Sequence, residues 1–561
     1  MTDGPRVALT TPRTDGQSVP EPAASGLRRG SLAGAVLLVA AVTVLARAVG
    51  FGRWVVFAHT VHSGCLADVY NTANLLPNVL FEVVAGGALA GAVVPVLAPA
   101  VARGDRATVD RLVSALLTWS LALLVPVSVI AAAAARPLIG AFLGAGHCPA
   151  AAPDVGTRML LVFLPQLFCY AVAVVLSGAA QAHRRFLAAA LAPLVSSTVV
   201  IGAYLLFARL AHGDTGVDTV PRSARAALAV GTTLGVLALA ATVTIPIRAT
   251  GLRLRPRWTF PSGTARQVRG LAAAGVAALL AQQGALLVVI WLANHNGTPG
   301  SVTVYTWAGA VFLLPYAALA VPLATAAFPR IAAATAAGDR AAVARLTAAG
   351  ARGVMAAGCL GAAVLVAVAA PVSRLFAAGG SALDTARVAD GITAIAPGLA
   401  GYALAAHLSR VLYAAHRGRR AAVATVAGWV AVAAIDLTAV PALPGRRTVT
   451  VLAIGSTIGF TLSGLLLLLA VRRLHGPAAL AGLARTGPVT LVAAVLLGEA
   501  GRQLGEHLGT TNASGSAVAA AVVGGAVVVG YVGLVGLADR RCLSGLEVPA
   551  LRRPRLLPRS L

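Results

Sequence analysis

Two arginines lie inside the first long apolar run of the chain, in the stretch L-A-R-A-V-G-F-G-R-W that begins at position 45. A guanidinium at membrane depth is costly, and such groups usually face a water-filled cavity or an anionic partner. Arg47 and Arg53 are six positions apart, about 120° around an ideal helix. Both can reach one anion only if the helix is distorted near Gly50 and Gly52. Otherwise one binds the ligand and the other braces a neighbouring helix. The spacing predicts a cationic, anion-binding patch.

Polar residues in the second apolar run are the candidate partners of these arginines. Glu82, in L-P-N-V-L-F-E-V-V-A-G-G, is the nearest carboxylate in the sequence, and a purely structural Arg–Glu pair is the alternative to a binding patch. Asn71, Asn74 and Asn78 recur at helical spacing and predict a polar stripe toward a cavity or another helix. The candidate substrate-binding residues are therefore Arg47, Arg53, Glu82, Asn74 and Asn78.

Three other ionisable residues in apolar runs are weaker candidates. Arg410, in H-L-S-R, is expected to snorkel to the membrane surface. Asp436 and Glu499 lie near the outer ends of late runs, where each could bind a proton or a cation or be an interfacial carboxylate.

No catalytic signature is found in the sequence. It contains no Walker loop, no H-E-x-x-H and no nucleophile elbow, so we predict neither catalytic residues nor an enzyme. The five cysteines form no C-x-x-C pair, which predicts no metal or redox site. Cys65 and Cys148 both fall in segments predicted to lie outside, where a disulfide and two unrelated thiols are both open.

Composition places these residues in a polytopic helical membrane protein. The 561 residues are 58% hydrophobic and 11% charged, with a mean hydropathy of +0.85. The net charge of +26 would suggest nucleic acid in a soluble chain. Here the positive charge is all arginine and sits mainly in short loops, so we predict no nucleic-acid partner.

Fourteen apolar runs are long enough to be spanning helices. Most arginines fall in alternate loops, which predicts a multi-pass protein with both termini in the cytoplasm. The runs lie near 31–61, 69–101, 112–134, 156–181, 186–210, 224–246, 268–293, 301–329, 353–376, 388–413, 421–443, 448–471, 487–505 and 515–538.

The sequence repeats itself at an offset of 234 residues. The stretch 93–112 matches 327–346 without a gap, aligning Pro95 with Pro329 and G-D-R with G-D-R. Six runs separate the copies, which predicts two parallel six-helix lobes around a central cavity, as in alternating-access transporters. The predicted organisation is a disordered cytoplasmic tail (1–30), an N-terminal lobe (31–246), a basic cytoplasmic linker (247–269), a C-terminal lobe (268–471), two extra helices (487–538) and a basic cytoplasmic tail (539–561).

These motifs resemble the MurJ/MviN family, the proposed lipid II flippases of the multidrug/oligosaccharidyl-lipid/polysaccharide exporter superfamily. The family pattern S-R-x-x-G-F-x-R-D is matched here by both arginines with Gly50 and Phe51, and A-D-x-[FY] is matched around Asp68. L-P-N contains Pro77, V-P contains Pro95, and the second half supplies L-P at Pro315 and F-P at Pro329. Phe81, Glu82, Gly309 and Ala310 stand where well-known members carry a charged pair or arginines.

The resemblance implies the all-α fold of about fourteen helices and a function. Lipid II, or a similar polyprenyl-pyrophosphate-linked sugar, would cross from the inner to the outer leaflet of the bacterial cytoplasmic membrane for cell-wall synthesis. Arg53 would grip the pyrophosphate, and the two extra helices would hold the lipid tail. No cofactor is implied; the membrane potential or a coupled ion would drive transport. Membrane lipids and cell-wall enzymes are the other implied partners.

Two other functions remain open from the sequence. One is export of another lipid-linked polysaccharide or of a drug by the same architecture. The other is a non-transporting scaffold for cell-wall enzymes, which the missing arginines favour and the preserved repeat disfavours.

Overall fold

The computed structural model describes residues 26–538 apart from 145–147, 184, 249–250, 261–263, 377–381 and 510–511. This described part is helical and contains no strand, as expected for the predicted all-α class. The predicted tail 539–561 and residues 1–25 lie outside it. The helix α1 begins at Gly26, inside the predicted tail of 1–30. Helices also extend into both ends of the predicted 247–269 linker, because α9 ends at Arg248 and α10 begins at Thr264.

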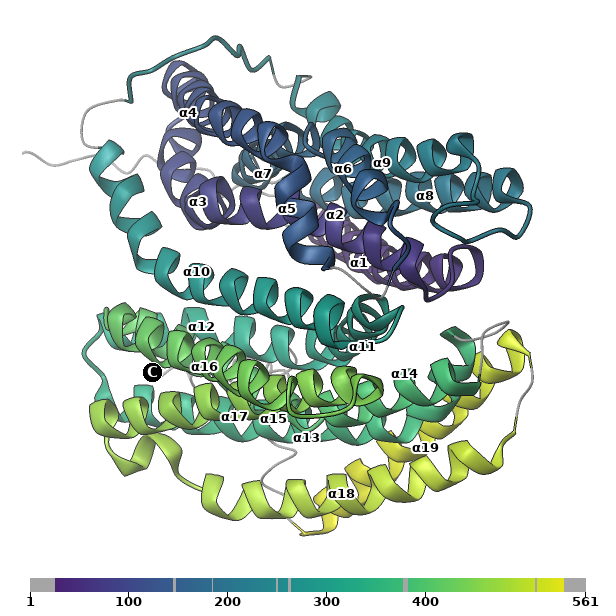
Figure 1. The fold of residues 1–561 in the computed structure, drawn as a ribbon. Helices are drawn as coiled ribbons and strands as arrows, with labels where there is room; N and C mark the ends of the chain where they lie inside the picture. The colour runs from purple at the N-terminus through teal and green to yellow at the C-terminus, as the bar shows by residue number, and fades with distance from the viewer. Residues whose placement is uncertain are drawn as a thin grey trace, which may run out of the picture.

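The first half of the chain forms one group of helices (Figure 1). These are α1 (Gly26–Thr60), α2 (Cys65–Phe81), the π-helix η1 (Glu82–Gly86), α3 (Gly87–Ala102), α4 (Arg106–Ala133), α5 (Ala135–Leu143), α6 (Ala152–Phe163), α7 (Gln166–Ala182), α8 (Phe186–Ala211) and α9 (Arg222–Arg248). In this group α8 packs on α1 and α9, and α7 packs on α3, α4 and α9.

The second half forms a second group, and α10 lies between the two (Figure 1). It comprises α10 (Thr264–Asn296), α11 (Ser301–Pro315), the π-helix η2 (Tyr316–Ala320), α12 (Val321–Ala336), α13 (Arg340–Phe376), α14 (Ala382–Ile395), α15 (Gly398–Ala414), α16 (Gly418–Ala439), the short 3₁₀ segments η3 (Gly445–Arg447) and η4 (Pro477–Leu480), and α17 (Thr448–His475). The last helices, α18 (Leu483–His507) and α19 (Ala513–Ala538), both pack on α13. Helix α10 packs on α16 and, across the halves, on α3.

The structure carries the internal repeat down to irregular details. The π-helix Glu82–Gly86 recurs as Tyr316–Ala320, and α3 recurs as α12, both at the repeat offset of 234 residues. Each π-helix follows a proline, Pro77 or Pro315, that cannot donate to the regular helical ladder. The two π-helices begin at a polar residue, Glu82, and at an aromatic residue, Tyr316. π-Helical turns are rare and often mark functional sites.

The number of spanning helices differs from the prediction. All fourteen predicted runs fall on helices, but the second run is divided into α2, η1 and α3. In the described residues twelve helices are long and apolar enough to cross a membrane, or thirteen with the pair α14–α15, which is bent by 44°. The count of fourteen therefore stays a prediction, while a polytopic membrane fold is clear.

Candidate functional site

Arg53 lies on α1 with its guanidinium beside an aromatic ring. Its central carbon is 5.1 Å from the centroid of the Trp54 ring, a cation–π arrangement. The side chain is half-buried, and its Nε is buried without a hydrogen-bond partner. An unsatisfied buried donor on a cation is costly unless a ligand or water completes it. Arg53 is therefore suited to receive an anion.

Arg47 is separate from Arg53. Helix α1 is continuous through Gly50 and Gly52, so the distortion that would aim both arginines at one ligand is not seen. Arg47 is exposed, and no salt bridge joins either arginine to Glu82 in the described part of the chain. The purely structural Arg–Glu pair is therefore not formed in this conformation.

Glu82 and Asn78 line a cavity of about 530 Å³ within the first half of the chain. Helices α2, η1, α3, α7 and α9 form its walls, and Tyr170, Ser177 and Gln181 add polar groups. Asn74 is not in the lining; its backbone oxygen accepts from Asn78 Nδ2 at 3.0 Å. The predicted substrate-binding set is thus divided between this cavity and α1.

The Glu82 carboxylate depends on a glycine in its own π-helix. A Cβ added at Gly86 would stand 2.5 Å from Glu82 Oε2, so only glycine leaves room for this side-chain position. Among the described residues no cation pairs with Glu82. The cavity therefore offers a carboxylate where the resemblance leads one to expect an arginine.

Asp68 joins the two halves of the protein. It is 3% exposed on α2, and its carboxylate accepts three hydrogen bonds from the start of α11. The donors are Gly300 N at 2.7 Å, Thr303 N at 2.9 Å and Thr303 Oγ1 at 2.7 Å. A carboxylate at a helix N-terminus satisfies orphan N–H groups and the helix dipole, so Asp68 caps a helix of the opposite half.

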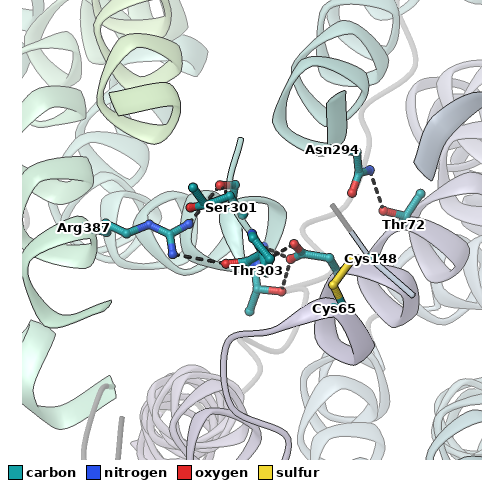
Figure 2. Close-up of a disulfide and its surroundings, with 11 residues drawn as sticks. Cys65, Thr72, Cys148, Asn294, Ser301, Thr303 and Arg387 are labelled. Atoms are coloured by element: carbon teal, nitrogen blue, oxygen red, sulfur yellow. Dashed lines mark hydrogen bonds between the residues drawn. A yellow bond between two sulfur atoms is a disulfide. The ribbon is translucent and has the colours of Figure 1, made fainter. Parts of the chain in front are cut away.

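Neighbouring side chains extend this contact into what we call the gate cluster: Asp68, Asn71, Thr72, Asn294, Ser301, Thr303 and Arg387. Figure 2 shows Thr72, Asn294, Ser301, Thr303 and Arg387 of this cluster near the Cys65–Cys148 disulfide. Asn71 donates to Thr303 Oγ1 at 3.0 Å, and Asn294 donates to Thr72 Oγ1 at 3.1 Å. Arg387 on α14 donates to Ser301 Oγ at 2.8 Å and to the Pro299 carbonyl at 3.2 Å. Nearby, Phe51 packs edge-on against Phe376 with ring centroids 5.8 Å apart. One end of the molecule is closed by bonds between the halves.

A disulfide joins Cys65 to Cys148, with Cα atoms 5.5 Å apart. It resolves the open alternative in favour of bonding. Cys65 begins α2 three residues before Asp68, so the bridge ties the start of the gate-bearing helix to the segment that precedes α6. Disulfides persist in oxidising compartments, which favours placing this end outside the cytoplasm.

An apolar cavity of about 260 Å³ lies between η2, α12, α13 and α19. Leu319, Leu323, Leu360 and Val535 are in its wall. The described residues contain no group of three or more His, Cys, Asp or Glu that could hold a metal ion.

Only part of this site was identifiable from the sequence. Asp68 was selected as a structural motif residue, and Arg387 was not selected at all. Arg387 falls one residue before the apolar run predicted at 388–413, among the residues assigned to a loop, so its burial could not be predicted from the apolar pattern.

The chain is similar to known proteins in sequence and in fold. The family model described as lipid II flippase MurJ matches residues 57–518. The probable lipid II flippase MurJ of Rhizobium tropici is 26% identical over 54% of this chain and 55% of that protein. The one of Rhizobium meliloti (strain 1021) is 28% identical over 52% and 54%. The chain thus spans about half the length of the curated relatives it matches.

Two solved structures share the fold. A lipid II flippase MurJ in an inward closed conformation superposes with a TM-score of 0.70 at 15% identity, covering 90% of this chain and 100% of that one. A multidrug resistance MATE family transporter in an inward-facing conformation gives 0.62 at 16% identity, covering 77% and 94%. The family model, which matches most of the chain, decides the assignment: this multi-pass membrane protein belongs to the lipid II flippase MurJ family.

Proposed function

We propose that the protein moves lipid II from the inner to the outer leaflet of the bacterial cytoplasmic membrane by alternating access, without a catalytic step. The gate cluster carries the proposal, because a carboxylate of one half caps a helix of the other half at one end of the molecule. Such a contact must break when the halves rock apart. Family membership supports the cargo and a role in supplying cell-wall enzymes with precursor.

The gate cluster lies at the end we assign to the outside. The arginine-rich loops lie at the opposite end, and the Cys65–Cys148 disulfide lies at the gate end. With the gate closed, cargo reaches the interior from the cytoplasmic side. Both termini are cytoplasmic in this orientation.

The anionic head of the cargo is assigned to Arg53. A guanidinium offers paired donors to pyrophosphate and does not lose its proton. The polyprenyl tail would lie against the apolar cavity beside α13 and α19. The inside-negative potential favours outward movement of the anion by about 2.3 kcal/mol per charge per 100 mV.

The function is tested in cells whose own lipid II flippase can be depleted. We expect this protein to restore the accessibility of lipid II to an added enzyme that cleaves only outward-facing lipid II. A correctly inserted protein that restores nothing would contradict lipid II flipping. Glu82 in the cavity would then favour a cargo with a positive group, such as a drug. Transport of another lipid-linked polysaccharide would identify an exporter of that cargo, and transport of no cargo would identify a scaffold.

We further propose Asp436 as the coupling residue of this transport. It is 0% exposed on α16, and neither carboxylate oxygen has a hydrogen-bond partner. A buried carboxylate without a partner either takes a proton or holds a cation. By contrast, the Glu499 carboxylate accepts hydrogen bonds from Arg502 Nη2 at 2.6 Å and Arg502 Nε at 2.8 Å, so its charge already has a partner.

Asp436→Asn is expected to remove the response of flipping to an imposed ion gradient. Flipping in vesicles would be measured with a Na⁺ gradient and, separately, with a pH gradient, which identifies the ion. Glu499→Gln is the matched control and keeps the wild-type response. An Asp436→Asn protein that still responds to both gradients as the wild type does would exclude this role.

A further inference from the structure

Residues 253–257, between α9 and α10, are hydrogen-bonded along α4. Three alternate arginines donate their backbone N–H groups to polar side chains that recur every fourth residue of α4. The bonds run from Arg253 to Asp110 Oδ1 at 3.2 Å, from Arg255 to Ser114 Oγ at 3.1 Å and from Arg257 to Thr118 Oγ1 at 3.0 Å. We call residues 252–260 the strap.

The two spacings show that the strap is extended. Four residues of a helix advance about 6.0 Å, and two residues of an extended chain advance about 6.6 Å. Three consecutive bonds in this register require an almost straight backbone. In such a backbone successive side chains alternate between two faces. Arg253, Arg255 and Arg257 therefore share one face, and Leu254 and Trp258 share the other.

The ends and the free edge of the strap are also adapted to this position. Leu252 and Phe260 pack half-buried against the main apolar core. The Trp258 carbonyl accepts from Trp119 Nε1 at 3.0 Å, and the two indole rings meet edge to face at 5.4 Å. Position 256, whose N–H would point away from α4, is a proline and has no N–H.

Both faces of the strap are exposed. All three arginines are exposed, and none of them forms a salt bridge with a described residue. No acidic residue occurs between Ile247 and Phe260, and the Asp110 carboxylate accepts the backbone of Arg253. On the apolar face Trp258 is 60% exposed and Leu254 is 42% exposed.

We propose that the strap binds anionic phospholipid headgroups, with its arginines on the phosphates and Leu254 and Trp258 at the acyl boundary. An acidic soluble partner would satisfy the arginines but leave the indole in water, whereas a membrane surface satisfies both faces. Tryptophan favours the interface, and each arginine near an anionic surface adds attraction. The site does not depend on which cargo is flipped. In the proposed orientation it faces the inner leaflet.

The test titrates the full-length protein in detergent with phosphatidylglycerol or phosphatidylcholine and counts bound lipids by native mass spectrometry. We expect tighter binding of phosphatidylglycerol, weakened roughly tenfold to a hundredfold in the triple variant R253Q/R255Q/R257Q. The matched control R417Q/R419Q/R420Q removes the same charge from three exposed arginines at the start of α16, Arg417 before its first residue and Arg419 and Arg420 in its first turn, and keeps the tight binding. Equal losses in both variants, or none in the strap variant, would overturn the proposal.

Two further measurements separate the remaining sources of the signal. Inorganic phosphate at the same concentration should not displace phosphatidylglycerol; displacement would make this a general phosphate site and overturn lipid recognition. The contribution of Trp258 to the protein fluorescence is the difference between the wild type and Trp258→Phe. In bilayers with brominated acyl chains, we expect this contribution to be strongly quenched. If the fluorescence of Trp258 is not quenched, the indole lies away from lipid and the proposal is contradicted. This measurement does not need the triple variant, so it still tests the proposal if that variant fails to fold.

Discussion

Asp68→Ala is expected to open the gate end of the protein in a large fraction of molecules. The substitution removes three hydrogen bonds to a buried carboxylate and leaves the Gly300 and Thr303 N–H groups without a partner. Hydrogen bonds to charged groups contribute about 1.5–3 kcal/mol each, and they are not additive. A net loss of about 3 kcal/mol changes the ratio of closed to open molecules roughly a hundredfold.

The opening is measured as a distance between the halves. Spin labels at Asp218 and Leu443, both exposed in turns of opposite halves, report it by double electron–electron resonance. The three cysteines outside the disulfide, Cys169, Cys359 and Cys542, are replaced by serine first. We expect one short distance in the unsubstituted background and an added longer one with Asp68→Ala.

Asp105→Ala is the matched control for this experiment. Asp105 caps α4 by accepting from Thr108 N at 3.0 Å, and the hydrogen bonds from Thr108 lower its pKa below the ordinary value. The Asp105→Ala variant therefore also loses an ionised helix cap, but this cap lies within one half of the protein. It should lower stability only slightly and leave the distance unchanged. A longer distance in both variants would mean that loss of a cap, not the gate, opens the protein.

The sequence predicts the helices of this protein well because the membrane imposes a simple requirement. Every spanning segment must be long, apolar and internally hydrogen-bonded, so composition alone reveals where helices lie. The repeat adds which helices correspond. Neither rule predicts the π-helix at Glu82, because hydropathy does not distinguish a π-helical turn from an α-helical turn within one apolar run.

The gate cluster shows the other limit of sequence analysis. Asp68 and Thr303 are 235 residues apart, and their contact depends on how the two halves pack. No periodicity relates them, so Asp68 could be selected only through resemblance. The strap is intermediate: its basic character was predicted, but the alternation R-L-R-P-R-W acquires meaning only beside Asp110, Ser114 and Thr118.

Arg53→Ala is expected to reduce lipid II flipping by roughly tenfold to a hundredfold if the proposed function holds. The guanidinium is the half-buried cation of α1, and its buried Nε has no partner in the described structure. A charge-assisted hydrogen bond lost from bound pyrophosphate is worth about 1.5–3 kcal/mol, which is the basis of this range. The measurement is external accessibility of lipid II in flippase-depleted cells, normalised to the amount of inserted protein.

Two more variants define what Arg53 contributes. Arg53→Lys keeps the charge but loses the planar fork and much of the contact over Trp54, so partial activity is expected. Arg209→Ala removes an exposed arginine from α8, another apolar run, and should leave flipping unchanged. If Arg53→Ala flips lipid II as fast as Arg209→Ala and the wild type, Arg53 is not in the path of the cargo. Loss in Arg53→Ala with partial recovery in Arg53→Lys would instead mean that the positive charge at this position acts on the cargo and that the guanidinium hydrogen bonds add to it.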